Sequence, residues 1–177
     1  DLKDNDDYTS IINQNHYDRL QDLLNDAVEK GATIDEINPA NEDFSQQEHF
    51  KIPPTIVSNT TDDMKIMQEE IFGPLLPVVE YDEIDEATKL INSKDRPLGL
   101  YYFGNDQSEQ DNILNKTSSG GVTVNNVISH LQQNDLSFGG VGPSGMGRYK
   151  SFEGFKNFSN PRAVSYTHLR AHETVHY

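Results

Sequence analysis

Cysteine is absent from the 177 residues of this sequence, and both long apolar runs and positive charge are scarce. Without cysteine, these residues contain no disulfide, no thiolate metal ligand and no cysteine nucleophile. No apolar run approaches the roughly 18 residues that a membrane-spanning helix needs. The 14 Lys and Arg are outnumbered by 29 Asp and Glu, which gives a formal net charge of −15. Because such a surface repels phosphate backbones and anionic lipid, we expect no nucleic-acid partner and no membrane partner.

The hydrophobic fraction is also low, at 34%, but the length suffices for one domain with a core. The chain begins at Asp1 with neither an initiator methionine nor a signal peptide. We therefore expect a fragment of a longer protein. Sequons occur at Asn59, Asn115 and Asn157, and they are expected to be chance matches because no secretory signal accompanies them.

The last 14 residues, VSYTHLRAHETVHY at 164–177, differ in character from the sequence before them. His168, His172 and His176 would share one face of a helix, so a metal site is one interpretation. An expression tag is another. The segment also resembles the translation of a sequencing adapter. We therefore interpret 164–177 as a non-native tail and 1–163 as native sequence.

Apolar residues between positions 13 and 30 recur at the spacing of a helix. Asn13 or Asn15 can cap the start of this helix, and Gly31 can end it. The side chains expected on its inner stripe are Tyr17, Leu20, Leu24, Ala27 and Val28, with Leu23 widening the stripe.

The next stretch gives weaker signals. Residues 35–50 are polar and without a clear period, which indicates a loop or a weak hairpin. Residues 51–57 end in strand-forming residues, but Pro53 and Pro54 cannot donate to a ladder, so an edge strand or an extended run is predicted. Residues 75–81, LLPVVEY, are predicted to form a buried strand.

Helices and strands alternate in the second half of the chain. Helices are predicted over 82–93 and 106–116, and strands over 98–104 and 120–128. This order predicts an α/β fold with a parallel sheet. A final segment, 154–164, is predicted to be an edge strand. The side chains expected to face inward from the two helices are Ile84, Ala87, Leu90, Ile91, Ile113 and Leu114.

Five glycines and one proline fall within residues 137–147, SFGGVGPSGMG. The stretch matches neither G-x-G-x-x-G nor G-x-x-x-x-G-K-[ST], and it follows a polar loop and not a strand, so a phosphate-binding loop is disfavoured. We expect a tight loop whose backbone passes close to another part of the protein.

Two acids, Glu69 and Glu70, stand directly before Ile71 and Phe72 in the stretch MQEEIFGPLLP. Neighbours in a strand point to opposite faces, so a paired-carboxylate acid–base site is disfavoured. One carboxylate could instead accept hydrogen bonds from a vicinal diol through its two oxygens. Phe72, on the same face of a strand as Glu70, could then pack against a flat ring. The alternative is a surface acid in an ion pair, followed by a core phenylalanine.

His130 is the one histidine near a predicted strand end, just past 120–128. No second His, Cys or acid accompanies it at ligand spacing. A position at the edge of the core or in solvent is therefore expected, and no metal site is predicted in the chain.

Four segments together carry a resemblance to a known family. MQEEIFGPLLPV, at 67–78, resembles the E-E-x-F-G-P segment of the aldehyde dehydrogenase superfamily. The segments 96–104, 117–130 and 136–149 resemble the next three blocks of that family, in order. The resemblance runs from about Asp7 to Val164, and it is strongest to the coniferyl aldehyde dehydrogenases, which are relatives of the class 3 enzymes.

This resemblance implies the later half of the family's α/β catalytic domain, with a terminal oligomerisation strand. It implies oxidation of an aldehyde, of an aromatic type like coniferyl aldehyde, to its acid with NAD or NADP. By resemblance, Glu70 holds the nicotinamide ribose hydroxyls, Phe72 packs beside the nicotinamide, and Phe138 lines the aldehyde pocket. The family's catalytic Cys, Asn and Glu precede this segment, so no catalytic residue is expected here, and the parent is expected to be a cytoplasmic homodimer or larger assembly.

The sequence departs from the family pattern at a few positions. Asn126 stands where Asp is common, Ser137 replaces a usual Pro, and Lys150-Ser151 replaces a usual His-Gly. These changes concern substrate preference more than membership. Two alternatives stay open: a non-catalytic interaction or oligomerisation module that reuses this part of the fold, and a hydrolase that uses two carboxylates and needs no NAD.

Overall fold

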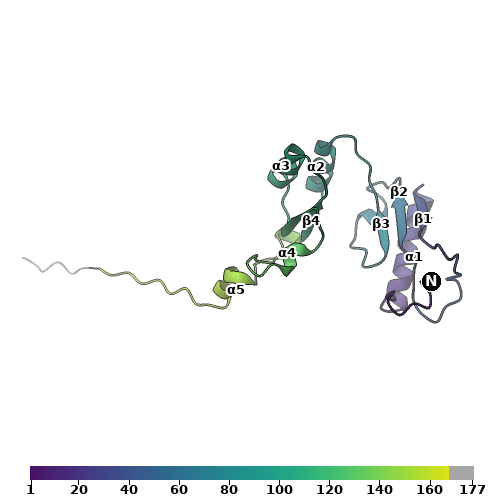
Figure 1. Ribbon diagram of the computed structural model, residues 1–177, viewed down its shortest axis with the longest axis horizontal. Coiled ribbons are helices and arrows are strands. Elements are labelled where there is room, and N and C mark those ends of the chain that lie inside the picture. The colour runs from purple at the N-terminus through teal and green to yellow at the C-terminus, as the bar shows by residue number, and fades with distance from the viewer. Residues whose placement is uncertain (168–177) are drawn as a thin grey trace, which may run out of the picture. The chain divides into compact units, whose positions relative to one another are not determined.

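The computed structural model describes residues 1–167 and divides the chain into two compact units. The first unit is Asp1–Glu80 and the second begins at Tyr81 (Figure 1). Helices and strands occur in both units, so the predicted α/β class is confirmed. None of the helices within the described residues is long and apolar enough to cross a bilayer.

The first unit is built on helix α1, Gln14–Glu29. The Asn13 side chain accepts a hydrogen bond from the backbone N–H of His16, which satisfies one free donor of the first turn. Gly31 follows the helix with a φ of +94°, a conformation that favours glycine. The predicted helix and both of its end signals are confirmed.

The buried face of α1 differs slightly from the predicted stripe. Leu20, Leu23 and Ala27 are at most 1% exposed, whereas Val28 is 54% exposed. Positions i, i+3 and i+7 share one line along a helix, and a residue next to that line is turned away by about 100°. Leu23 is therefore central to the core, and the prediction that Val28 faces inward was wrong. The buried residues that complete the core cluster are Ile52, Val57, Met64, Ile66 and Leu75.

A three-stranded sheet in the order β1-β2-β3 packs with α1 in this unit (Figure 1). Strand β1, Thr33–Glu36, is antiparallel to β2, Thr55–Ser58, and β2 is parallel to β3, Leu75–Pro77. Of the two alternatives predicted for 51–57, the edge strand was wrong, because β2 is the central strand. Residues 51–54, which precede β2, are not part of a strand. The prolines precede the first paired residue of β2, so no ladder hydrogen bond is lost. Strand β1 was not predicted from the sequence.

Strand β3 is shorter and more exposed than predicted. Leu75 is 5% exposed and belongs to the core, but Leu76 is 59% exposed. Successive strand residues point to opposite faces, and only the Leu75 face meets the core of the first unit. Val78 and Val79, which lie beyond the strand, are also exposed. The prediction of a buried strand over 75–81 therefore holds only for its first residue.

The second unit contains the predicted alternation of helices and strands. Helix α2, Ile84–Ser93, precedes strand β4, Gly99–Tyr102, and helix α3, Gln107–Lys116, precedes strand β5, Gly121–Val124. Strands β4 and β5 are parallel. The two helices contact each other, and the Asn92 side chain donates to the carbonyl of Lys116 across 2.8 Å. The parallel arrangement predicted from the sequence is confirmed here.

Side chains in α2 and α3 are oriented almost as predicted. Ile113 is 4% exposed, but Leu114 is 41% exposed, so the prediction that Leu114 faces inward was wrong. As in α1, adjacent residues on a helix diverge by about 100°. Thr88, which was not predicted to be buried, lies on the inner face of α2.

The end of the described chain is helical where a strand was predicted. After α4, Ser129–Gln132, and the 3-10 turn η2, Gly142–Ser144, helix α5 spans Ser151–Asn157. Residues 158–167 contain no strand. A strand is stable only when its backbone N–H and C=O groups are paired, and no described residue pairs with this segment. The predicted terminal strand is therefore not formed in the described residues.

Candidate functional site

The candidate site in the first unit is the acid loop, which we define as residues 69–73. It connects the 3-10 turn η1, Lys65–Met67, to strand β3, and its backbone is irregular. Glu69 and Glu70 therefore do not alternate across a strand, and that part of the prediction was wrong. The orientation of the two carboxylates is decided by tertiary contacts.

Glu69 is paired with an arginine of α1. Its carboxylate Oε1 lies 3.6 Å from Nη1 of Arg19, and both side chains are partly exposed. An ion pair at such a surface contributes about 0–1 kcal/mol, so its stabilising effect is small. Because Glu69 faces a cation, the pair Glu69–Glu70 lacks the shared-proton arrangement of a carboxylate dyad.

The same guanidinium also holds the backbone of the acid loop. Nη1 of Arg19 donates to the carbonyl oxygen of Glu70 across 3.2 Å, and Nη2 donates to the carbonyl oxygen of Ile71. Arginine can make both bonds because its donors lie in one rigid plane. The loop is thus fixed to α1 at two successive peptide groups.

Glu70 contributes only its backbone to these contacts. Its side chain is exposed, and its carboxylate has no hydrogen bond or ion pair within residues 1–167. A carboxylate without a partner in the protein keeps both oxygens available for donors on a ligand, such as two adjacent hydroxyls.

Phe72 has an unusual backbone and an exposed ring. Its φ is +48°, in the left-handed region, which costs a residue with a side chain roughly 1–2 kcal/mol. Phe72 is 70% exposed, so the alternative of a core phenylalanine at this position was wrong. Strained backbone of this kind occurs where surrounding contacts enforce it, often at functional sites.

The Phe72 ring lies at a cleft of about 690 Å³ in the first unit. The cleft is lined by residues 7–12, His16 and residues 72–74. Tyr8 is held in its wall by a 2.6 Å hydrogen bond from its hydroxyl to the carbonyl of Ile52, and burial raises the pKa of Tyr8. The structure thus brings Phe72 to a cavity, while Glu70 lies two residues before it and outside the cavity lining.

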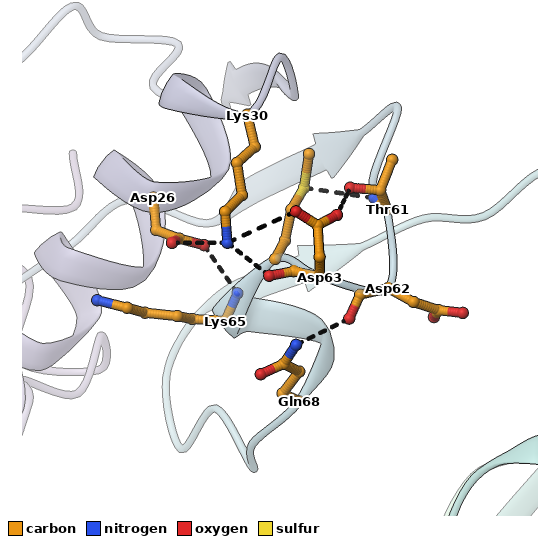
Figure 2. Close-up of polar contacts among 8 residues, drawn as sticks. Asp26, Lys30, Thr61, Asp62, Asp63, Lys65 and Gln68 are labelled. Atoms are coloured by element: carbon orange, nitrogen blue, oxygen red, sulfur yellow. Dashed lines mark hydrogen bonds and ion pairs between the residues drawn. The ribbon is translucent and has the colours of Figure 1, made fainter.

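A second set of contacts ties the approach to the acid loop onto the other end of α1 (Figure 2). The Asp26 carboxylate accepts a 2.8 Å hydrogen bond from the backbone N–H of Lys65 and lies 3.0 Å from Nζ of Lys30. These bonds, in that order of importance, hold the pKa of Asp26 below its ordinary value. Lys30 also reaches the side chain and the carbonyl of Asp63, and the hydroxyl of Thr61 helps to lower the pKa of Asp63.

Phe138 belongs to the second unit. Its backbone forms an isolated antiparallel bridge with Tyr149, and the two rings meet edge to face at 5.3 Å between centroids. The centroid of the His130 ring lies 6.4 Å from that of the Phe138 ring. Nδ1 of His130 is 2.8 Å from the hydroxyl oxygen of Thr123 in β5. His130 is half-buried, as expected for a histidine at the edge of the core.

The glycine-rich stretch 137–147 folds tightly against itself. A Cβ atom on Gly139 would lie 2.2 Å from the carbonyl oxygen of Gly147, and one on Gly140 would lie 2.1 Å from that of Ser144. Such distances exclude any side chain at either position. A Cβ atom on Gly120, which precedes β5, would lie 2.4 Å from the carbonyl oxygen of Gly139. The prediction of a loop whose backbone passes close to another part of the protein is therefore confirmed.

Two further positions singled out from the sequence are Lys150 and Ser151. Both have a positive φ, of 62° and 50°, which is a conformation that glycine adopts without strain. Within residues 1–167 no three His, Cys, Asp or Glu side chains gather as metal ligands. The histidines at 168, 172 and 176 lie outside the described residues.

Arg19 is the site residue that sequence reasoning missed. A single arginine on the polar side of a predicted helix is ordinarily a solvated side chain, so no local signal distinguished it. Its acceptors are 50 or more positions away in the sequence, and only the packed structure brings them together.

Comparison with known proteins gives one consistent family. The profile described as "Aldehyde dehydrogenase family" matches residues 1–164. A "Probable coniferyl aldehyde dehydrogenase" from Caulobacter vibrioides is 58% identical over 163 residues, which is 92% of this chain and 34% of the relative. A "Coniferyl aldehyde dehydrogenase" from a Pseudomonas species is 49% identical over 163 residues, again 92% of this chain and 34% of the relative. The chain thus spans about a third of the length of these curated relatives.

A relative that is described by its preference for NADP is also similar. "Aldehyde dehydrogenase, dimeric NADP-preferring" from Mus musculus is 40% identical over 174 residues, which is 98% of this chain and 36% of the relative. Among solved structures, the substrate-bound AldH of Staphylococcus aureus superposes with a TM-score of 0.77 at 36% identity. That superposition covers 98% of this chain and 38% of the other.

Proposed function

This chain belongs to the aldehyde dehydrogenase family, and from that premise we propose that it is the C-terminal part of an NAD- or NADP-dependent aldehyde dehydrogenase. The proposed reaction oxidises an aldehyde to its carboxylic acid. The names of two relatives support an aromatic substrate of the coniferyl aldehyde type. The name of another supports NADP as one possible cofactor and a dimeric parent.

In the proposed reaction a cysteine thiolate attacks the aldehyde carbonyl to give a thiohemiacetal. The bound nicotinamide cofactor supplies the oxidising chemistry, namely acceptance of a hydride. Water then releases the acid from the resulting thioester. Because this chain has no cysteine, the nucleophile in this proposal comes from outside its 177 residues, and the chain contributes binding and positioning groups.

The role that we propose for the acid loop is to hold the nicotinamide ribose. The observation that carries it is the Glu70 carboxylate, which is exposed and unpaired while its own backbone is fixed to α1. A fixed carboxylate can accept from both hydroxyls of a vicinal diol. The exposed ring of Phe72 fits a partner with a flat face. We propose that this ring packs beside the nicotinamide.

We also propose a wall of the aldehyde pocket at Phe138. Its ring is fixed by Tyr149 and His130, so it offers a rigid aromatic surface. For the domain organisation, we propose that residues 1–163 are native catalytic-domain sequence and that residues 164–177 are a non-native tail.

The test of the proposed function needs a complete enzyme. Residues 1–163 of this chain can replace the matched 163-residue segment of the Caulobacter vibrioides relative, because the two are 58% identical. The chimera is expected to oxidise coniferyl aldehyde with NAD or NADP, both of which should be tried. A folded chimera without turnover would instead favour a non-catalytic module.

Within that chimera, Glu70→Gln tests the ribose role. It should weaken transition-state stabilisation by about 1–3 kcal/mol, the free-energy cost of leaving a buried polar group poorly paired. This corresponds to a roughly 5- to 150-fold lower kcat/KM for the cofactor. Glu36→Gln is the matched control, because Glu36 is an exposed acid of β1 whose side chain has no partner in the described residues. Equal kinetics for Glu70→Gln and the control, with aldehyde saturating, would refute the role.

A further inference from the structure

We propose that Arg19 is a positioning residue that fixes the backbone of the acid loop so that the Glu70 carboxylate stays free for its ligand. This inference deepens the proposed function and rests on it for the identity of the ligand. The contacts that carry it lie within the first unit. They involve α1, the acid loop and the residues that precede the loop.

The acid loop adopts a conformation that it would not hold by itself. Phe72 has a φ of +48°, which a residue with a side chain avoids unless neighbours enforce it. The two carbonyl groups just before it, of Glu70 and Ile71, both accept from the Arg19 guanidinium. Arg19 therefore acts on the peptide groups that lead directly into the strained residue.

The next residue of α1 provides a second contact. Leu20 is fully buried, and its Cδ1 atom would lie 2.6 Å from a Cβ atom on Gly73. The chain can pass this close because Gly73 has no side chain. Arg19 and Leu20 thus hold the two ends of the acid loop, one by hydrogen bonds and the other by packing.

Arg19 forms its ion pair with the carboxylate of Glu69 and not with that of Glu70. The ion pair between Arg19 and the Glu69 carboxylate compensates the arginine charge at 3.6 Å, while Glu70 offers Arg19 only its carbonyl oxygen. The two acids therefore have separate roles. Glu69 compensates the arginine that positions the loop, and the Glu70 carboxylate is left for a ligand.

The C-terminal end of α1 holds Lys65, at the start of the segment that leads into the acid loop. Asp26, seven residues after Arg19 and on the same side of the helix, accepts from the backbone N–H of Lys65 (Figure 2). Seven residues of helix rise about 10 Å. Helix α1 thus holds the chain at Lys65 and again at residues 69–71, and the second attachment depends on Arg19.

Proteolysis of the full 177-residue chain tests the hold on the loop directly. A Glu-specific endoproteinase can cut the Glu70–Ile71 bond, and mass spectrometry gives the rate of that cut. Arg19→Lys keeps the charge but loses the planar fork, so the cut should become about tenfold faster or more, as expected when a charge-assisted hydrogen bond no longer opposes local opening. Arg162→Lys, at an exposed arginine of the second unit, is the control and should leave the rate unchanged.

Cleavage after Glu29, at the end of α1, separates local opening from unfolding of the unit. If the Glu29 and Glu70 cuts accelerate equally in Arg19→Lys, Arg19 only supports general stability and the inference is overturned. An unchanged Glu70 cut overturns it as well. A selective rise at Glu70 supports it.

Steady-state kinetics of the chimera test whether the acid loop affects cofactor binding. Arg19→Lys should raise KM for NAD or NADP severalfold with little change in KM for the aldehyde, and its effect should be less than additive with Glu70→Gln. If Glu70→Gln weakens cofactor use and Arg19→Lys does not, the positioning inference fails and the proposed function stands. If Glu70→Gln has no effect, the proposed function fails, and the proteolysis alone decides whether Arg19 holds the loop.

Discussion

Gly73 lies where helix α1 and the acid loop come closest, so its replacement by alanine is a sensitive test of this packing. A Cβ atom there would lie 2.6 Å and 2.7 Å from the two methyl carbons of Leu20. Carbon atoms in contact prefer about 3.5–4.0 Å, so one side must move by about 1 Å. Leu20 is fully buried and belongs to the core cluster, which leaves it little room to move.

The magnitude follows from two opposing effects. Overpacking of a core by one methyl group costs about 1–3 kcal/mol. Gly73 has no positive φ, so alanine can adopt its backbone conformation without strain. Because alanine also restricts the unfolded chain, it stabilises the folded state by about 0.4–1 kcal/mol. We expect Gly73→Ala to destabilise the first unit by about 1–2 kcal/mol. Native-state hydrogen exchange of peptides from α1 measures this value for that unit alone.

A double-mutant cycle identifies the cause. Leu20→Val shortens the side chain by one carbon, so that its two methyl groups no longer reach the Cδ positions that meet Gly73. This change costs about 0.5–1.5 kcal/mol by itself, but in its presence Gly73→Ala should become nearly neutral. The matched control is Gly31→Ala, because Gly31 has a φ of +94° and open space around it. That change should cost about 1–2 kcal/mol through backbone strain and stay additive with Leu20→Val. If the Gly73 cycle is also additive within about 0.5 kcal/mol, the packing argument is refuted.

Three other predictions concern the helix, the pH dependence and the tail. Leu23→Ala should destabilise the first unit by about 2–5 kcal/mol, whereas Val28→Ala, at an exposed site, should change its stability by less than about 0.5 kcal/mol; urea titrations give both values. Hydrogen bonds hold the pKa of Asp26 below its usual 3.8, so the ionised carboxylate stabilises the folded state. This stabilisation should be complete above about pH 4 and should be lost as the pH falls through the lower folded-state pKa. Acid titration of Asp26→Asn should therefore show a weaker loss of stability below pH 4, with Asp22→Asn, at an exposed acid of the same helix, behaving like the parent chain. Deletion of residues 164–177 should leave the melting temperature unchanged, and a clear drop would show that this tail is part of the fold.

Local sequence signals predicted those elements whose ends are marked by their own residues. Asn13 and Gly31 mark the ends of α1, and both were recognised because a cap acts within a few residues of the helix. Helix α3 is capped in the same local way, because the Asp106 side chain accepts a hydrogen bond from the backbone N–H of Glu109. The central position of strand β2 was not among the predicted alternatives, because a proline shows where a strand cannot donate and does not show which strands lie on either side of it.

The candidate-site residues also divide into those that the sequence indicated and one that only the structure revealed. Glu70, Phe72 and Phe138 were selected from the sequence through their resemblance to family segments, and their proposed roles await the experiments above. The partner of Glu69 could not be selected in that way. Arg19 is 50 residues earlier in the chain, and nothing in its immediate sequence indicates a partner so far away.

By itself, the amino-acid sequence determined the α/β class and the periodicity of the helices, because both are set by residue types and their local spacing. It also indicated the family, through the resemblance of four ordered segments to known family blocks. Tertiary structure decided the conformation of the acid loop. Its backbone is held by Arg19 and by the buried side chain of Leu20, and both contacts exist only after α1 packs onto the sheet of the first unit. A strained loop such as this one has no local preference for its own shape, so the orientation of its two acids is fixed by the helix against which it rests.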